Sequence, residues 1–505
     1  MGWAEDNDVN VHPKSPETGA SEPRLEPFDD ETFIAGPTFA AAKKIYPQST
    51  HGTYRRIKWA LLVMTLGVYY LLPFLRWDRG PNAPGQAVLV DLEHRRFYFF
   101  FIEIWPQEVY YFTGLLILAA LTLFLMNAVA GRVWCGYLCW QTVWTDLFMA
   151  VERRVEGDRR ERIQLDAAPW TAQKIAKRTT KHLLWLLVAW LTGGAWVLYF
   201  ADAPTLLKEL VTFQAPTIAY IWMGILTFTT YIFAGHMREQ TCLYVCPWPR
   251  IQAALTDENA LNVTYRLDRG EPRMSVKKAA ALRKSGQLAG DCIDCEQCLH
   301  VCPTGVDIRK GPSLGCIQCG LCIDACDNVM EKIGRPARLI AYDTDVNIRR
   351  RELGEKEVYR LVRPRTVLYA VLITLITAAM AFKLATRADT SLAVIHDRNP
   401  QYVLLSDGAV RNGFVLRFAN KASEARVFCV RVDGVQDAAL DLAGASKDDQ
   451  GRIRMEVGPD QTREARLLVS TKADLPKNAS LPLTFTLTDS AGAVVATAKD
   501  FFRGP

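Results

Sequence analysis

Long apolar runs alternate with charged blocks over most of the first 385 residues, and this pattern predicts a polytopic α-helical membrane domain. Five runs carry few charges over about twenty residues, the length that a helix needs to cross a bilayer. We therefore predict membrane spans at residues 59–75, 108–130, 182–200, 217–236 and 364–385. Between the first two, the aromatic patch 97–105 is too short to span and predicts an interfacial segment.

The basic residues are distributed unevenly between the flanks of these runs. Residues 131–181 contain ten Lys and Arg, whereas residues 201–216 contain one, Lys208. Since Lys and Arg concentrate in cytoplasmic loops, we expect residues 131–181, the N-terminus and residues 237–363 on the cytoplasmic side. Arg132 is then interpreted as an anchor at that face. Five spans place the chain beyond residue 385 in the periplasm.

The two ends of the chain differ from the membrane domain. Residues 1–45 are polar, Pro-rich and acidic, and lack the basic and apolar regions of a cleavable signal peptide. We interpret them as a flexible cytoplasmic tail. In residues 387–505, short alternating runs separated by Gly, Asp, Asn and Pro predict an antiparallel β-sandwich. Its one cysteine, Cys429, lies mid-strand and is interpreted as a small core residue rather than a metal ligand.

Eight of the thirteen cysteines lie in residues 292–326, where the pattern C-x2-C-x2-C-x3-C occurs twice. This spacing is typical of bacterial ferredoxins with two [4Fe–4S] clusters, in which the fourth cysteine of each run ligates the other cluster. The first cluster is predicted to take Cys292, Cys295, Cys298 and Cys326. The second is predicted to take Cys316, Cys319, Cys322 and Cys302. The alternative, two zinc sites, fits less well because zinc favours paired cysteines.

The predicted spans and these motifs together divide the chain into domains. The predicted membrane domain covers residues 46–255 with four spans, and a ferredoxin-like domain covers residues 256–363 before the fifth span. Pro303 follows the first cysteine run as the bacterial pattern requires, but Asp327 stands where the second proline is expected. We have no interpretation for that departure. His300, between two cysteines of the first run, is interpreted as a group that tunes its cluster.

Four more cysteines form two matching pieces, WCGYLCWQ (134–141) and TCLYVCPWPRIQ (241–252), each directly after a predicted span. If each C-x3-C motif is helical, its two thiols share one face. The four candidate residues are Cys135, Cys139, Cys242 and Cys246. They could form one metal site, where thiolates favour Cu(I), zinc or iron–sulfur groups. They could instead be redox-active dithiols or structural cysteines. His236, just before the second motif, is interpreted as an interfacial residue rather than a copper ligand.

Charge and composition exclude some function classes. The net charge of +6 is small and the basic residues lie in particular loops, which indicates membrane topology and no nucleic-acid binding. The cysteine spacing indicates metal thiolates in a reducing compartment rather than disulfides. No C-x-x-C-H haem motif occurs, because Leu299 follows Cys298. No nucleotide or flavin fingerprint is evident either, so the expected electron donor is another protein or a quinol.

The motifs WCGYLCWQ, TCLYVCPWP and CIDCEQCLHVCP…CIQCGLCIDAC, with a β-domain after the last span, resemble the cytochrome c oxidase accessory protein family CcoG, also called FixG or RdxA. The resemblance covers residues 45–505. It implies a multi-pass protein of the bacterial inner membrane with an immunoglobulin-like C-terminal domain. It also implies that the protein helps to mature a cbb3-type oxidase by reducing Cu(II) to Cu(I) for the oxidase copper centre.

Under that resemblance, Cys135, Cys139, Cys242 and Cys246 become the candidate catalytic and copper-binding residues, and the oxidase or its copper-loading factors become partners. The first motif ends in Cys-Trp and the second in Cys-Pro, so the equivalence of the halves stays open. Two other functions stay open as well. One is a quinol dehydrogenase-type subunit that feeds a periplasmic reductase, although that role does not need the sandwich. The other is a non-enzymatic copper-holding scaffold.

Overall fold

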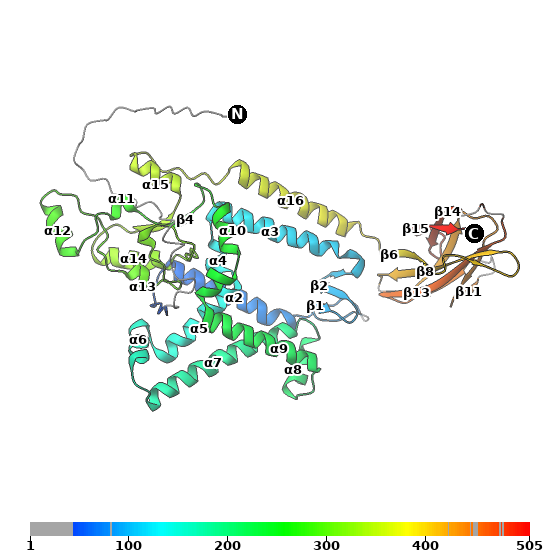
Figure 1. Ribbon diagram of the computed structural model, residues 1–505, viewed down its shortest axis with the longest axis horizontal. Helices are drawn as coiled ribbons and strands as arrows, with labels where there is room; N and C mark the ends of the chain where they lie inside the picture. The colour runs from blue at the N-terminus through cyan, green and yellow to red at the C-terminus, as the bar shows by residue number, and fades with distance from the viewer. Residues whose placement is uncertain are drawn as a thin grey trace, which may run out of the picture. The chain divides into compact units, whose positions relative to one another are not determined.

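The computed structural model describes residues 44–80, 83–422, 424–444, 446–447, 453–473, 476 and 479–504. One compact unit begins at Tyr46 and contains the described residues that follow it. The predicted tail 1–45 lies outside the described residues except at positions 44 and 45. Figure 1 labels most of the helices and several of the strands of the compact unit.

Among the described residues, four helices are long and apolar enough to cross a membrane. They are Thr53–Phe74 (α2, Thr53–Leu71, extended by η1, Leu72–Phe74), Tyr110–Ala130 (α3), Thr217–Met237 (α9, Thr217–Thr230, continued by the π-helical η3, Tyr231–Met237) and Pro364–Ala385 (α16). They coincide with four of the five predicted spans. Large apolar side chains such as Leu116 and Phe382 are exposed on them, as expected of a surface that contacts lipid.

The remaining predicted span, 182–200, lies mostly in α7 (Ala172–Val197), which is not one of the four candidate helices. The first half of α7 carries four cations, and only its second half is apolar. Two of them, Lys174 and Lys181, are buried against neighbouring protein groups. The five-span topology is therefore not confirmed, and neither is the orientation that depends on it.

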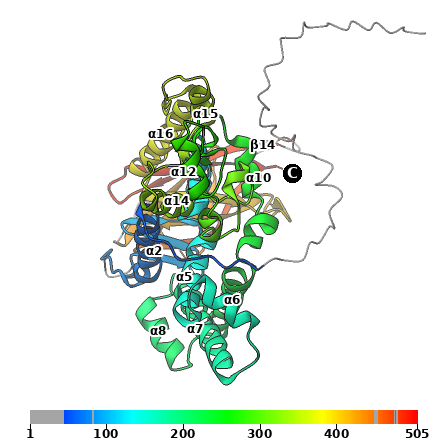
Figure 2. The same cartoon turned by 90° about the vertical axis from the view of Figure 1, so that its left-hand side faces the viewer.

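Helices α5 (Trp140–Glu156), α6 (Arg159–Ala167) and α7 lie side by side (Figure 1 and Figure 2). Phe148 of α5 stacks on Trp185 of α7 with ring centroids 5.4 Å apart. Helix α7 also packs on α9 at Gly193, where a Cβ would lie 2.7 Å from the Met223 carbonyl oxygen. A small residue at this crossing lets the two helices approach closely, as in other membrane bundles. Helix α8 (Ala203–Val211) follows α7.

The aromatic patch 97–105 forms part of a small antiparallel sheet rather than a helix. Its strands are β1 (Val88–Asp91), β2 (Arg96–Phe99) and β3 (Ile102–Ile104), paired in that order with Val88 opposite Phe99. The turn η2 (Pro106–Glu108) leads into α3. Alternating side chains of these strands face opposite sides, so Tyr98 is buried while its neighbours are partly exposed.

Two strands that pair antiparallel flank the cysteine-rich segment in the chain: β4 (Asn262–Tyr265) and β5 (Ile340–Asp343). Between them lie α11 (Leu267–Gly270), α12 (Val276–Lys284), α13 (Gln297–His300), η5 (Ile308–Lys310) and α14 (Leu321–Lys332). Helix α10 (Trp248–Leu255) precedes the pair and α15 (Asp345–Glu352) follows it. Ile323, Met330 and Ile340 form its apolar core together with several cysteines.

The C-terminal part is an antiparallel β-sandwich, as predicted. One sheet has the order β10-β13-β8-β6 with β7 beside β8, and the other has the order β11-β12-β9-β14-β15. The strands are Thr390–His396 (β6), Val403–Leu404 (β7), Val410–Asn420 (β8), Arg426–Asp433 (β9), Ala439–Leu442 (β10), Ser446–Lys447 (β11), Ile453–Val457 (β12), Gln461–Thr471 (β13), Ser480–Thr488 (β14) and Val494–Arg503 (β15). Phe414, Phe428 and Phe485 are fully buried in its core, and Cys429 is buried on β9.

Candidate iron–sulfur and thiol site

Four of the predicted cluster cysteines line a first, small cavity. They are Cys292, Cys295, Cys298 and Cys326. Cys298 comes from α13, Cys326 comes from α14, and the other two come from the loop before α13. Met330, Leu339 and Ile340 form the apolar wall. We call this the first cysteine cavity.

A second, similarly small cysteine cavity lies beside the first. Its lining includes Cys302, Cys316, Cys319 and Cys322, and it shares Cys298 with the first cavity. Within the described residues, no three His, Cys, Asp or Glu side chains converge closely enough to hold a single metal ion. Thiols spread around a cavity suit a [4Fe–4S] cube, which takes one thiolate per iron, better than they suit zinc.

The two cysteine loops share a backbone feature that the spacing alone does not reveal. Asp294 and Glu296 flank Cys295 and have φ of 55°. Gln318 and Gly320 flank Cys319 and have φ of 54° and 73°. Left-handed residues in such turns direct backbone N–H groups into a concavity that favours negative charge. Both loops are therefore shaped to hold an anionic group, such as a cluster with its four thiolates.

Burial raises the pKa of Cys298, Cys316 and Cys326 to about 12. Cys319 and Cys322 are more deeply buried, and their pKa values are raised as well. Only thiolates ligate metal, so these thiols have to lose protons when an iron–sulfur group enters.

In each C-x3-C motif, a helix contains the first cysteine and ends before the second. Cys135 lies in α4 (Val133–Tyr137), and Cys139 is the extended residue before α5. Cys242 lies in the π-helical η4 (Thr241–Val245), and Cys246 follows in extended conformation. The expected arrangement of both thiols on one continuous α-helical face is therefore not formed in either motif.

The four C-x3-C thiols nevertheless gather in one place. Burial raises the pKa of Cys135 to about 11, Arg132 lowers it, and the thiols of Cys139 and Cys246 raise it further. Burial likewise raises the pKa of Cys242 to about 12, and all three other thiols add to the effect. The Cys135 thiol also donates a hydrogen bond to Gln252 Oε1 at 3.2 Å. The four thiols interact electrostatically, but they would have to move closer to one another to bind one ion.

The first C-x3-C motif is docked directly on the loop of the second cysteine cavity. A Cβ on Gly136 would lie 2.7 Å from the Ile317 carbonyl oxygen and 3.0 Å from the Cys319 Cα. The Tyr137 hydroxyl donates to the Cys319 carbonyl oxygen at 3.0 Å. Cys135 packs in one buried cluster with Cys319. Only glycine between the two cysteines permits this approach.

Arg132 strengthens the same contact instead of serving as a membrane anchor. It is 5% exposed, and its backbone N–H donates to Gln318 Oε1 at 2.7 Å. Its guanidinium donates to the Leu314 carbonyl oxygen at 2.5 Å. The cysteine loop is also held from α2, because Asp324 of α14 accepts hydrogen bonds from the backbone N–H groups of Tyr54 and Arg55.

Three further residues singled out in the sequence have defined surroundings. Asp327 accepts a hydrogen bond from the Arg338 backbone N–H at 2.6 Å, so it ties α14 to the turn before β5. His300 lines neither cysteine cavity, and its ring lies 3.8 Å from Glu296. His236 stacks on His182 with ring centroids 5.9 Å apart.

Two buried carboxylates in α5 hold the surrounding helices together. Asp146 pairs with Arg55 at 2.9 Å and with Lys58 at 3.5 Å. Glu152 pairs with Arg162 at 2.7 Å and with Arg238 at 3.0 Å. Burial by itself would raise both pKa values, but the cations outweigh it and hold the pKa of each carboxyl below its usual range.

These shifts predict that the protein loses stability in acid. A carboxyl whose pKa is lower in the folded state stabilises the fold above its unfolded pKa, near 4, and loses that contribution as the pH falls through the folded value. We expect the free energy of unfolding to fall below roughly pH 4. Unfolding followed by circular dichroism should show a shallower acid dependence in the Asp146→Asn/Glu152→Gln variant. An unchanged acid dependence in that variant would show that these carboxyls are not responsible.

Three family models match the chain. A 4Fe-4S dicluster domain matches residues 237–345, a 4Fe-4S binding domain matches residues 112–156, and the IG-like fold at the C-terminal of FixG matches residues 380–505. The first range includes the second C-x3-C motif and both cysteine loops. The second includes Cys135 and Cys139.

Curated relatives match nearly the whole chain. Nitrogen fixation protein FixG of Rhizobium meliloti is 47% identical over 493 residues, which cover 92% of each chain. Protein RdxA of Cereibacter sphaeroides is 48% identical over 479 residues, which cover 93% of this chain and 99% of that one. Protein RdxB of the same organism is 52% identical over 409 residues, or 80% of this chain and 85% of that one.

The fold, the cysteine cavities and the matching models together define an iron–sulfur electron-transfer protein with membrane-type helices and a C-terminal immunoglobulin-like domain. Within that class, the chain belongs to the FixG and RdxA family.

Proposed function

We propose that this protein carries electrons through two [4Fe–4S] clusters to a thiol site, where Cu(II) is reduced to Cu(I) for the copper centre of a cbb3-type oxidase. The observation that carries the proposal is the contact between the first C-x3-C motif and the second cysteine cavity, with Gly136 against Cys319. This contact would let electrons pass from a cluster to the thiols without a mobile carrier.

The ligand assignment within this proposal follows the two cavities. Cys292, Cys295, Cys298 and Cys326 would hold one cluster, and Cys302, Cys316, Cys319 and Cys322 would hold the other. Bound there, the clusters supply single electrons. We assign residues 256–363 as a ferredoxin-like domain, whose apolar walls keep water from the thiolates.

Copper is the substrate in this proposal, and Cys135, Cys139, Cys242 and Cys246 are its ligands. Thiolates are soft and prefer Cu(I), so four of them would make reduction by one electron more favourable. The raised pKa values of Cys135 and Cys242 mean that copper binding releases protons. Arg132, which lowers both pKa values, would help the thiols to ionise.

In the proposed topology, the cationic start of α2 and the cysteine-rich segment face the cytoplasm of the bacterial inner membrane. The apolar second half of α7 would complete a fifth span and put residues 387–505 in the periplasm. The sandwich would there contact the oxidase or a copper-loading factor. The name of the Rhizobium relative, a nitrogen fixation protein, supports a role in a redox system.

The Cys242→Ala/Cys246→Ala variant tests the thiol site. Purified protein with dithionite-reduced clusters should convert Cu(II) to Cu(I), whereas the variant should fall to background because two of the four thiolates are gone. Cu(I) formation is followed with a chromogenic Cu(I) chelator. Cluster content, measured by EPR and iron analysis, should be unchanged, since neither residue lines a cysteine cavity.

Cys429→Ala is the control, because it removes a buried cysteine from the sandwich. Copper reduction at the wild-type rate by the double variant would exclude Cys242 and Cys246 as the site. The match of a 4Fe-4S binding domain to residues 112–156 favours a second candidate, in which the C-x3-C thiols hold an iron–sulfur group. Iron analysis separates the two, because a further cube adds about four iron atoms per chain.

A further inference from the structure

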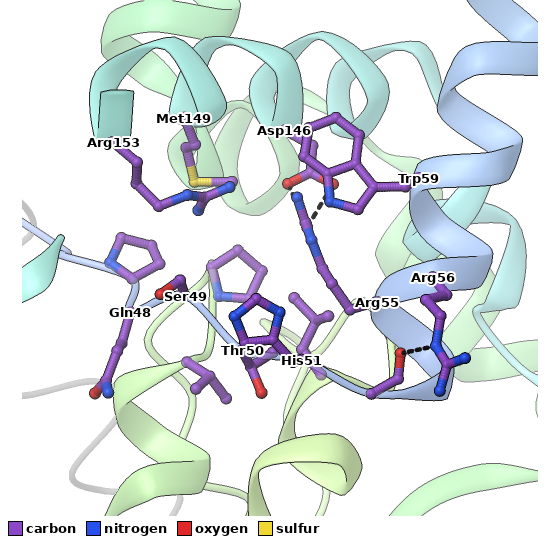
Figure 3. Close-up of a pocket in the computed structure, with 15 residues that line it drawn as sticks. Gln48, Ser49, Thr50, His51, Arg55, Arg56, Trp59, Asp146, Met149 and Arg153 are labelled. Atoms are coloured by element: carbon purple, nitrogen blue, oxygen red, sulfur yellow. Dashed lines mark hydrogen bonds and ion pairs between the residues drawn. The ribbon is translucent and has the colours of Figure 1, made fainter. Parts of the chain in front are cut away.

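A cavity of about 390 Å³ lies where α2 and α5 meet the cysteine-rich segment (Figure 3). Its volume is within the range of small-molecule sites. Residues 47–52 form one side, the first turns of α2 form another, and Asp146, Met149 and Arg153 of α5 form a third. We call it the interfacial cavity.

The fourth side of the interfacial cavity is formed by three residues of the cysteine-rich segment, of which Leu321 also lines the second cysteine cavity. Val301 and Pro303 line the interfacial cavity, and these two residues flank Cys302 in the chain. Leu321 also lines it and directly precedes Cys322. Three of its lining residues are therefore neighbours in the chain of Cys302 and Cys322, and Leu321 separates the two cavities. No part of the copper proposal accounts for a cavity at this place.

A buried hydrogen-bond donor beside the interfacial cavity, on a residue that lines it, lacks a partner. Arg55 is 8% exposed, and its Nη1 pairs with both Asp146 carboxylate oxygens at 2.9 Å. Its Nη2 is buried and has no hydrogen-bond partner among the described residues. Leaving such a donor unpaired is costly, so a ligand oxygen would satisfy it. Figure 3 shows Arg55, Arg153 and His51, from three different segments, around the same opening.

The interfacial cavity continues toward the apolar surface of the helices. An adjoining cavity shares Ser49, Trp59 and Arg153 with it; its other lining residues are the apolar Leu147, Ala150 and Val151 of α5 and the charged Arg154 and Asp158. Trp59 is 36% exposed and lies in the first candidate span. A ligand with a polar head and an apolar tail could thus enter from the bilayer and place its head beside Arg55.

We propose that the interfacial cavity binds a membrane quinol and is the point where electrons enter the iron–sulfur clusters. The inference rests on the proposed function, because it names the electron donor for the same clusters. The bound quinol loses two electrons and two protons and becomes a quinone. The two electrons would be accepted one each by the two clusters that the eight cysteines would hold. The protons leave by way of His51, which is exposed, to water.

Arg55 has a defined part in this step. Its Nη2 would donate to one quinol oxygen and stabilise the negative charge that develops there as the proton leaves. The competing occupant is an anionic phospholipid, which the cations Arg55, Arg56 and Arg153 would also attract. A lipid headgroup, however, gives no reason for a wall formed by residues next to Cys302 and Cys322. The position therefore favours a redox-active head.

The test uses full-length protein in nanodiscs, without copper and without oxygen. A short-chain ubiquinol or menaquinol analogue is added, and cluster reduction is followed by visible absorbance and EPR. Arg55→Lys keeps a cation beside Asp146 but removes Nη2, so quinol-driven reduction should slow by about tenfold or more. Reduction by dithionite should be unchanged. The matched control is Arg365→Lys at the start of α16, which should behave like wild type because Arg365 does not line the cavity.

A second variant tests the same cavity independently, so the test does not depend on whether Arg55→Lys folds. His51→Trp puts a larger side chain at an exposed position of the same cavity and should cause the same selective loss. Wild-type quinol rates in both variants would overturn the proposal. The proposal would also be overturned if dithionite, but not quinol, reduces the clusters of the wild-type protein. In that case, phospholipid that co-purifies with wild type and is lost in Arg55→Lys would identify a lipid site. The readout is cluster reduction alone, so failure here is distinct from failure of copper reduction.

Discussion

Replacing Glu152 with alanine should lower the free energy of unfolding by about 3–5 kcal/mol, the usual cost of removing one partner from a buried ion pair. Glu152 is 2% exposed, and its partners come from three other segments: Arg162 of α6, Lys181 of α7 and Arg238 after η3. Glu156 can still pair with Lys181 at 2.9 Å. Arg162 and Arg238 lose the carboxylate to which both are paired, and these two uncompensated cations cause the loss.

The measurement is denaturant unfolding in detergent, followed by circular dichroism. Glu355→Ala is the control, because Glu355 pairs with Arg350 at 2.9 Å on the surface, where such a pair contributes about 1 kcal/mol or less. Equal losses in the two variants would mean that burial of Glu152 does not decide its effect.

The same carboxylate also positions the second C-x3-C motif. Arg238 lies four residues before Cys242, has a φ of 40°, and donates its backbone N–H to the Phe233 carbonyl oxygen at 2.8 Å. Its guanidinium is held by Glu152 at 3.0 Å. Loss of Glu152 therefore releases the turn that precedes η4, which carries Cys242. Under the proposed copper function, the variant should also bind copper less tightly.

Under the proposed function, replacing Gly136 with leucine should slow electron delivery from the clusters to copper by about tenfold to a hundredfold, because a shift near 1 Å at a reacting centre can have that effect. Any Cβ at this position would lie 2.7 Å from a backbone oxygen and 3.0 Å from the Cys319 Cα. These atoms belong to the main chain, so α4 and the cysteine loop have to separate. Dithionite reduction of the clusters in the variant, followed by a Cu(II) assay, measures the delivery step.

Gly224→Leu is the matched control, since a Cβ added at Gly224 of α9 would meet no other atom within 4 Å. Its clusters and its copper reduction should equal those of wild type. If Gly136→Leu also reduces copper at the wild-type rate, the contact between α4 and Cys319 is not the route of the electrons. Loss of cluster signals in Gly136→Leu alone would show that the contact shapes the second cysteine cavity as well.

Much of the cysteine chemistry could be predicted from the sequence because its spacing is local. In each C-x2-C-x2-C triplet the first two cysteines lie in a loop and the third lies at the start of a helix, and in the first cysteine cavity α14 brings in the remote Cys326. The sandwich was predictable for a similar reason, since alternation along each strand determines which side chains face inward. Neither conclusion required knowledge of contacts between distant segments.

Other features depend on contacts between segments that are distant in the sequence, and the sequence alone did not predict them. The cations of α7 resemble a solvent-exposed helix end in the sequence, but Lys181 is buried against Glu156. Asp327 had no interpretation until its hydrogen bond to the Arg338 backbone was known. The i, i+4 expectation for the C-x3-C motifs assumed a continuous helix, which ends at Tyr137 in the first motif. No local signal in the sequence indicates these partners.

The kinds of chemistry available to this protein follow from its amino-acid order alone: thiolate loops for iron–sulfur groups, two further dithiol motifs, apolar helices and a β-sandwich. They do so because ligand spacing and hydrophobic periodicity act between near neighbours. How these parts are connected became clear only from the folded arrangement. The contact of Gly136 with Cys319 and the pair of Arg55 with Asp146 join residues 183 and 91 positions apart. Packing between whole helices places such residues together, and no spacing rule encodes it.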